Sequence, residues 1–213
     1  MAGVTAVESL VMALYDVEKN GMTTQPLIDG SPARATVFLD RDGVINIDCG
    51  YPHREDQLTL TPTAAEAIAM LNRVGCLVIV VTNQSGVARG LFNMDDVHRF
   101  HALLQARISL SEAHIDAFYI SPYHRDGTVA PFNIDHDDRK PSPGMLMRAM
   151  REWPVDRERC VLIGDRRSDA EAAHRAHIPS IIVAPNVVDL AATVANWLDR
   201  LDLRLEMGRD WSV

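Results

Sequence analysis

The sequence predicts an α/β protein of three layers, in which helices cover both faces of a mainly parallel β-sheet. From residue 35 onward, short apolar runs typical of strands alternate with longer segments of helical spacing. Residues 77–82 (LVIVVT) form a nearly continuous β-branched run, as expected for a strand buried on both faces. The chain has 213 residues, which suffices for one domain with a full core, and we expect that domain to span 35–213.

Each expected element rests on a local pattern. Strands are expected at 35–40, 77–82, 116–120, 160–164 and 180–184. Helices are expected at 62–74, 95–110, 142–152, 168–177 and 187–203. In the first of these helices, Pro62 stands near the start and Gly75 follows the end, which is the usual asymmetry of helix termini. Residues 121–141 show neither pattern, so we expect them to be irregular.

Residues 1–34 are expected to form an extension and linker. Apolar residues recur there at helical spacing and predict a short amphipathic helix: Val4, Val7, Leu10, Val11 and Leu14. Residues 21–32 are rich in glycine and proline and indicate a linker. No apolar run reaches the roughly 18 residues of a membrane span, and the first residues lack a basic leader segment. We therefore expect a cytoplasmic protein without a membrane partner.

Composition excludes several classes of function. The net charge of −8 and sequence pI near 5.4 argue against a broad nucleic-acid or membrane surface. Three scattered cysteines, Cys49, Cys76 and Cys160, indicate reduced thiols and no disulfide framework. Lysine occurs only at Lys19 and Lys140, so Lys140 stands out as a compact point charge among arginines.

Four polar segments lie where expected strands end or an expected helix begins: 40–43 (DRDG), 82–86 (TNQSG), 139–141 (RKP) and 164–169 (GDRRSD). In an open α/β sheet such segments converge at one edge, where active sites form. Phosphoryl transfer needs a nucleophile in line, neutralised phosphate oxygens and a proton for the leaving group. The four segments together offer all three.

Specific roles follow from these requirements. Asp40 is the candidate nucleophile and would form an aspartyl-phosphate. Asp42 would act as general acid towards the leaving oxygen and then as base for water. The Thr82 hydroxyl would hold a phosphoryl oxygen, and Lys140 would neutralise charge on the phosphate and on Asp40.

Taken together, the segments resemble the haloacid dehalogenase (HAD) superfamily of phosphohydrolases, over about residues 35–185. Within it, residues 38–46, 50–51, 81–90 and 139–146 closely resemble the D-glycero-D-manno-heptose-1,7-bisphosphate 7-phosphatases, relatives of the histidinol-phosphate phosphatases. The resemblance implies a Rossmann-like HAD fold and a phosphomonoesterase acting on a small phosphorylated sugar, as in lipopolysaccharide synthesis. The short intervals between the expected strands leave no room for an inserted cap domain.

Mg²⁺ is the expected cofactor, because it prefers oxygen ligands and keeps several waters. The Asp40 carboxylate, the Asp42 backbone carbonyl and the Asp165 carboxylate would supply three ligand positions. Asp169, one helical turn beyond Asp165, is expected to orient the metal shell rather than to bind directly.

Many members of the resembled family carry a zinc loop of three cysteines and one histidine. The matching residues here are 121–124 (SPYH) and 136–139 (HDDR), in which every cysteine is missing. Zinc affinity depends on thiolate and imidazole donors, so we expect no structural zinc. A weaker nitrogen and oxygen site at His124, His136 and Asp138 stays open.

Substrate contacts are expected from the loops beside the motifs: Asn46, Tyr51, Asn83, Gln84, Arg89 and Arg139. The arginine forks of Arg89 and Arg139 suit phosphate groups. Arg166 stands where the heptose enzymes usually carry lysine, and Gly-Asp-Arg is closer to the histidinol-phosphate group. The alternatives are therefore a histidinol-phosphate phosphatase or another small sugar-phosphate phosphatase.

Three further alternatives are weaker. The acidic charge disfavours a polynucleotide 3′-phosphatase. A calcium loop starting at Asp40 would place Tyr51 where a bidentate glutamate is required. A phospho-receiver or signalling module also uses Asp, Thr, Lys and Mg²⁺, but Asp42 beside the expected acceptor favours turnover of the phosphoryl group over its storage.

We expect a monomer or weak oligomer.

Overall fold

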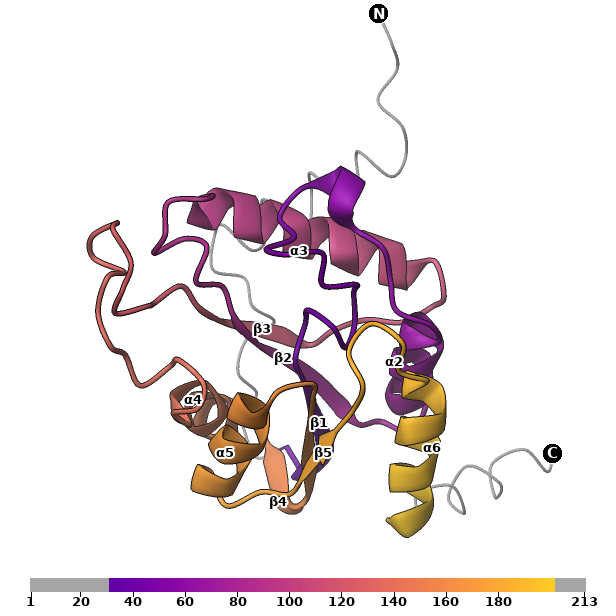
Figure 1. Cartoon of the computed structure of the whole chain (residues 1–213). Coiled ribbons are helices and arrows are strands. Elements are labelled where there is room, and N and C mark those ends of the chain that lie inside the picture. Colours follow the sequence, from indigo (N-terminus) through magenta and orange to yellow (C-terminus); the bar gives the residue numbers. More distant parts are fainter. Residues whose placement is uncertain (1–30, 202–213) are drawn as a thin grey trace, which may run out of the picture.

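Five parallel strands form one sheet in the order β3-β2-β1-β4-β5, in a computed structural model that describes residues 31–201 (Figure 1). The strands are β1 (Arg34–Leu39), β2 (Leu77–Asn83), β3 (Ala117–Ser121), β4 (Val155–Gly164) and β5 (Ser180–Ile182). The first strand of the chain thus lies at the centre, and successive strands are added outward on either side. This doubly wound order brings the carboxyl ends of β1, β2 and β4 together.

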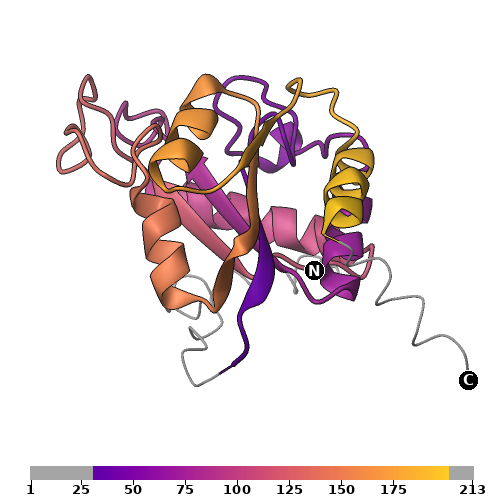
Figure 2. The ribbon, with the colours of Figure 1, turned by 90° about the horizontal axis from the view of Figure 1, so that it is seen from below.

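Five α-helices cover the two faces of the sheet: α2 (Ala64–Arg73), α3 (Met94–Ser109), α4 (Gly144–Glu152), α5 (Arg167–Arg175) and α6 (Leu190–Arg200). Helices α2, α3 and α6 lie on one face and α4 and α5 on the other (Figure 2). Strand β1 shows why, because Val37 and Leu39 point into the first core and Phe38 into the second. The expected three-layer α/β/α fold is confirmed.

Several boundaries differ from the expectation by one to five residues, and the two largest shifts at the start of an element have a local cause. Strand β4 begins at Val155 rather than at residue 160, because Val155 pairs with Arg34 across an irregularity in the ladder. Helix α6 begins at Leu190 rather than at 187, because the side chain of Asp189 accepts a hydrogen bond from Ala192 N at 3.0 Å. A short 3₁₀ turn, Glu55–Gln57, was not expected.

The segments between the strands are short. In residues 31–201, only the 3₁₀ turn and α2 lie between β1 and β2, and only α3 lies between β2 and β3, so no cap domain is inserted there. No helix in the same range is long and apolar enough to cross a membrane. The expected helix near residues 4–14 lies outside the described residues.

Candidate active site

A cavity of about 580 Å³ opens at the carboxyl edge of the sheet. The fold brings most of the expected site residues to its wall: Asp40, Asp42, Tyr51, Thr82, Asn83, Gln84, Arg89, Arg139 and Lys140. Asp40 directly follows β1, Thr82 is the last residue but one of β2, and Lys140 lies shortly before α4. Side chains far apart in the sequence therefore meet because their strands are parallel neighbours.

The ammonium group of Lys140 lies at the floor of the cavity. Its Nζ is 2.9 Å from Asp40 Oδ1 and 2.6 Å from Asp169 Oδ1, and it donates to the carbonyl of Val81 at 2.8 Å. Asn83 holds the backbone of Lys140, since its Nδ2 donates to Lys140 O at 2.9 Å and its Oδ1 accepts from Lys140 N at 3.0 Å. The Asn83 side chain thus positions Lys140, while Asn83 also lines the cavity in which its contact with substrate is expected.

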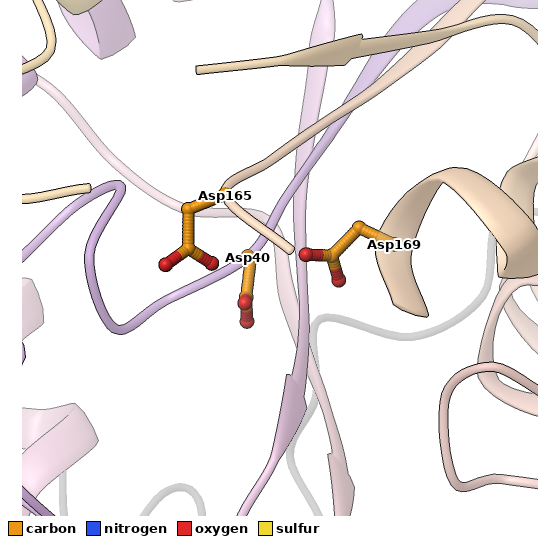
Figure 3. Close-up of side chains that lie close together, drawn as sticks. All are labelled: Asp40, Asp165 and Asp169. Atoms are coloured by element: carbon orange, nitrogen blue, oxygen red, sulfur yellow. The ribbon is translucent and has the colours of Figure 1, made fainter. Parts of the chain in front are cut away.

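Three carboxylates, from Asp40, Asp165 and Asp169, offer oxygen atoms that lie within 4.8 Å of one another. Figure 3 shows Asp165 and Asp169 on two sides of Asp40. The two oxygens of Asp169 face Lys140 and the backbone N–H of Arg166, whereas the buried Oδ1 of Asp165 has no hydrogen-bond partner. A carboxylate oxygen beside Asp40 that accepts no hydrogen bond, with Arg166 Nε 3.9 Å away, fits a divalent cation held by Asp40 and Asp165 and oriented by Asp169.

Burial raises the pKa values of the carboxyl groups in this cluster. The pKa of Asp40 rises to about 7, although Lys140 acts against the shift. Burial also raises the pKa of Asp165, against the opposing effect of Arg166. For Lys140, burial lowers the pKa, but the Asp40 and Asp169 carboxylates outweigh it and the net pKa is raised. A divalent cation would favour the ionised carboxylates.

A glycine is required where the first motif passes the Asp165 carboxylate. Gly43 has φ +84°, and a Cβ atom there would lie 2.6 Å from Asp165 Oδ2. A side chain at this position would therefore strain the backbone and displace an oxygen of the Asp165 carboxylate. The turn at Gly43 brings the loop against Asp165.

Asn46 and Gln84 both donate to the Asp42 carboxylate; Asn46 does not line the cavity, contrary to the expectation, whereas Gln84 does. Asn46 is fully buried, and its Nδ2 donates to Asp42 Oδ1 and to Ile47 O, both at 3.0 Å. Gln84 is 2% exposed, and its Nε2 donates to Asp42 Oδ2 and to Thr82 Oγ1, both at 2.9 Å. Both side chains orient the Asp42 carboxylate, because each offers an amide N–H to it.

Three arginines, Arg89, Arg139 and Arg166, line the rim of the cavity. Arg166 Nη2 pairs with Asp48 Oδ2 at 2.9 Å, and Arg139 Nη1 donates to the carbonyl of Tyr123 at 3.0 Å. Burial lowers the pKa of Arg139, and the neighbouring Arg89 and Arg166 cations act in the same direction. Such crowding of like charges favours an anionic ligand. Arg166 was not among the expected substrate contacts, and only its place after Asp165 could have indicated it.

The irregular segment that follows β3, up to residue 139, is held by ring stacking and by ion pairs, among them Arg125 with Asp135 at 2.9 Å. The rings of Tyr123 and His136 stack with centroids 3.8 Å apart, and Asp138 Oδ2 lies 2.9 Å from Arg148 Nη1. Within residues 31–201, Asp40, Asp165 and Asp169 make up the only group of three or more His, Cys, Asp or Glu residues whose ligand atoms lie close enough to share an ion. The open possibility of a metal at His124, His136 and Asp138 is therefore not supported.

Comparisons with known proteins agree with this geometry. The HAD-hydrolase-like family model matches residues 138–197. A D-glycero-beta-D-manno-heptose-1,7-bisphosphate 7-phosphatase of Rhodopseudomonas palustris is 43% identical over 70% of this chain and 83% of its own length. Its counterpart in Photorhabdus laumondii is 38% identical over 71% and 79%.

A solved structure gives the same result. The D,D-heptose 1,7-bisphosphate phosphatase of B. bronchiseptica, complexed with magnesium and phosphate, has a TM-score of 0.67 and 28% identity, with 78% of this chain and 98% of that chain covered. The chain belongs to the HAD-like phosphatase family that includes the D-glycero-D-manno-heptose-1,7-bisphosphate 7-phosphatases.

Proposed function

We propose that this protein hydrolyses the C7 phosphate of a D-glycero-D-manno-heptose 1,7-bisphosphate through a phosphoaspartate on Asp40. The observation that carries the proposal is a cavity with a reactive carboxylate at its floor and arginines Arg89, Arg139 and Arg166 at its rim. A substrate with two phosphates could place one at Asp40 and the other at the rim. The relatives' names give the sugar.

The chemistry divides between two carboxylates. Asp40 attacks phosphorus, the bond to the sugar oxygen breaks, and Asp42 gives that oxygen a proton. Water then attacks the phosphoaspartate, Asp42 takes its proton, and phosphate leaves with Asp40 restored. Lys140, 2.9 Å from Asp40, places positive charge beside the transferring group throughout.

The arginines at the rim also favour one of the alternatives. Histidinol phosphate carries an ammonium group and an imidazole, and these would meet three arginines, Arg89, Arg139 and Arg166, against one carboxylate, Asp48. A phospho-receiver stores its phosphoryl group and needs no general acid two residues after the acceptor, whereas Asp42 is held at that place by several donors. We therefore favour a bisphosphorylated sugar over either.

Phosphate release compared across substrates tests the proposal. We expect kcat/KM for the heptose 1,7-bisphosphate to exceed that for histidinol phosphate by about 100-fold, because a charged hydrogen bond contributes about 1.5–3 kcal/mol. Arg139→Met should raise KM for the bisphosphate while leaving KM for p-nitrophenyl phosphate nearly unchanged. A preference for histidinol phosphate, or an equal effect of Arg139→Met on both substrates, would contradict the assignment.

We further propose that Mg²⁺ is the working metal and that the chain holds no structural zinc. Asp40, Asp165 and the Asp42 backbone carbonyl would hold the magnesium ion, which supplies positive charge to the phosphoryl oxygens. Segment 121–139 has no cysteine, and the Tyr123–His136 stack fixes it by packing instead. A neighbour complexed with magnesium and phosphate supports the first part.

Metal binding should depend on pH with a defined sign. The pKa of Asp40 is about 7 without metal, so below that pH each ion bound must displace a proton. We expect the Kd for Mg²⁺ to rise about tenfold for each unit below pH 7 and to level off above pH 8. Calorimetry in two buffers measures the proton release, and Asp165→Asn should weaken Mg²⁺ binding at every pH.

Stoichiometric zinc in the purified protein would overturn the proposal that the chain holds no structural zinc.

A further inference from the structure

Arg41, between the two catalytic aspartates, is a charged side chain with no exposed surface. Burying a guanidinium is costly unless its charge and its donors are matched by partners. The reaction proposed above assigns Arg41 no role, although it directly follows the nucleophile. Its partners therefore indicate what it does.

One side of the Arg41 guanidinium binds both oxygens of the Asp42 carboxylate. Arg41 Nε donates to Asp42 Oδ1 at 2.9 Å, and Nη2 donates to Asp42 Oδ2 at 3.0 Å. This is a two-point contact between a planar fork and a planar carboxylate, and it fixes both the place and the tilt of the carboxylate. A lysine could not reproduce it, because an ammonium offers one centre.

The other side of the guanidinium is anchored to distant parts of the chain. Nη2 donates to the carbonyl of Pro52 at 2.9 Å, Nη1 lies 3.1 Å from His101 Nε2, and the cation lies 4.5 Å from the centroid of the Phe100 ring. Burial and the Arg41 cation hold the pKa of His101 well below its ordinary value, so the neutral ring can accept from Nη1. Helix α3 and the loop before the 3₁₀ turn thus set where Asp42 lies.

Asp42 accepts two further hydrogen bonds, from Asn46 at 3.0 Å and from Gln84 at 2.9 Å. Each carboxylate oxygen therefore has two donors, and one of them must give way when Asp42 carries a proton. Arg41 and Asn46 are fully buried, whereas Gln84 also lines the cavity. The exchangeable donor is accordingly Gln84, and Arg41 is the fixed one.

We propose that Arg41 is a positioning residue, which acts through Asp42 by holding the general acid and base in line with the leaving oxygen and the hydrolytic water. The proposal rests on the phosphatase function proposed above. If it holds, loss of Arg41 should lower kcat/KM most for esters whose leaving group needs a proton from Asp42. Esters of poorly acidic alcohols need that proton, and esters of strongly acidic phenols do not.

The test is therefore the dependence of kcat/KM on the leaving group in Arg41→Lys. For an alkyl phosphate we expect kcat/KM to fall about 100-fold, the size of a general-acid contribution, and for dinitrophenyl phosphate to change less than about threefold. With dinitrophenyl phosphate the variant should also release a rapid burst of phenolate, because breakdown of the phosphoaspartate still needs Asp42. If Arg41 had a role in folding alone, kcat/KM would fall equally for both substrates and no burst of phenolate would appear.

Arg54→Lys is the matched control, because Arg54 makes the same two-point contact with Asp56 on the surface, at 2.9 and 3.1 Å. This variant should leave kcat/KM unchanged for both substrates. If Arg41→Lys does not fold, His101→Leu removes the anchor of Nη1 and should give a smaller effect in the same direction, which His101→Gln restores by keeping an acceptor. Equal losses for both leaving groups in these variants would refute the role of Arg41. Wild-type protein that releases no phosphate from any ester would instead refute the proposed function.

Discussion

Asp40→Asn is expected to lower kcat by at least about 10⁴-fold, because an amide cannot form the phosphoaspartate on which both steps depend. The fold should survive the change. Burial raises the pKa of Asp40 to about 7 from an ordinary 3.8, so the folded state binds a proton that the unfolded state has lost between these values. The metal-free wild type therefore loses stability as pH rises through this range.

The stability of Asp40→Asn, measured by thermal unfolding in chelator, should consequently improve relative to wild type between about pH 5 and pH 8. Asp156→Asn is the control, since Asp156 pairs with Arg159 far from the cavity, at 2.7 Å. It should leave turnover unchanged. Residual turnover of Asp40→Asn above about 1% of wild type would mean that another group is the nucleophile.

Lys140→Met should cost both activity and stability. Lys140 Nζ lies 2.9 Å from Asp40 and 2.6 Å from Asp169, and its side chain is only 2% exposed. Removing the cation leaves two buried carboxylates without it, a change that costs about 3–5 kcal/mol in comparable buried pairs. For a protein of this size we expect Tm to fall by about 6–20 °C. Loss of the positive charge beside the transferring phosphate should lower kcat by about 10³-fold.

Metal and pH separate the two consequences of Lys140→Met. The loss of stability should grow as pH rises, because the carboxylates without their cation ionise at greater cost, and added Mg²⁺ should recover part of it. Lys140→Arg keeps the charge and should recover more of Tm than of kcat, since a larger fork cannot take three partners arranged around one Nζ. An unchanged Tm in Lys140→Met would show that the two carboxylates are not jointly ionised in the folded protein.

The sequence allowed the layers, the parallel sheet and the location of the chemistry to be predicted. Apolar runs of the strand type alternate with helical spacing, and this alternation requires a parallel sheet. Asp40, Thr82 and Asp165 then had to meet, because each stands at the carboxyl end of a strand and those ends share one edge. These inferences need only the direction of the chain along each strand.

Boundaries were less accurate where partners decide them. The polar residues at the start of β4 carry no strand pattern, yet Val155 pairs with Arg34 and extends the strand. The start of α6 depends on whether the Asp189 side chain turns back to the helix. Both depend on contacts that the local pattern does not contain.

What only the tertiary structure decided is which polar side chains face the substrate and which hold other side chains in place. Asn46 and Gln84 stand beside the motifs, but their amides turn to Asp42. Arg41 is buried against His101, a residue 60 positions away. The type of a residue and its place at a strand end follow from the sequence. The direction of a hydrogen bond between distant residues is set by how the helices and loops pack, and that determines which donors hold Asp42.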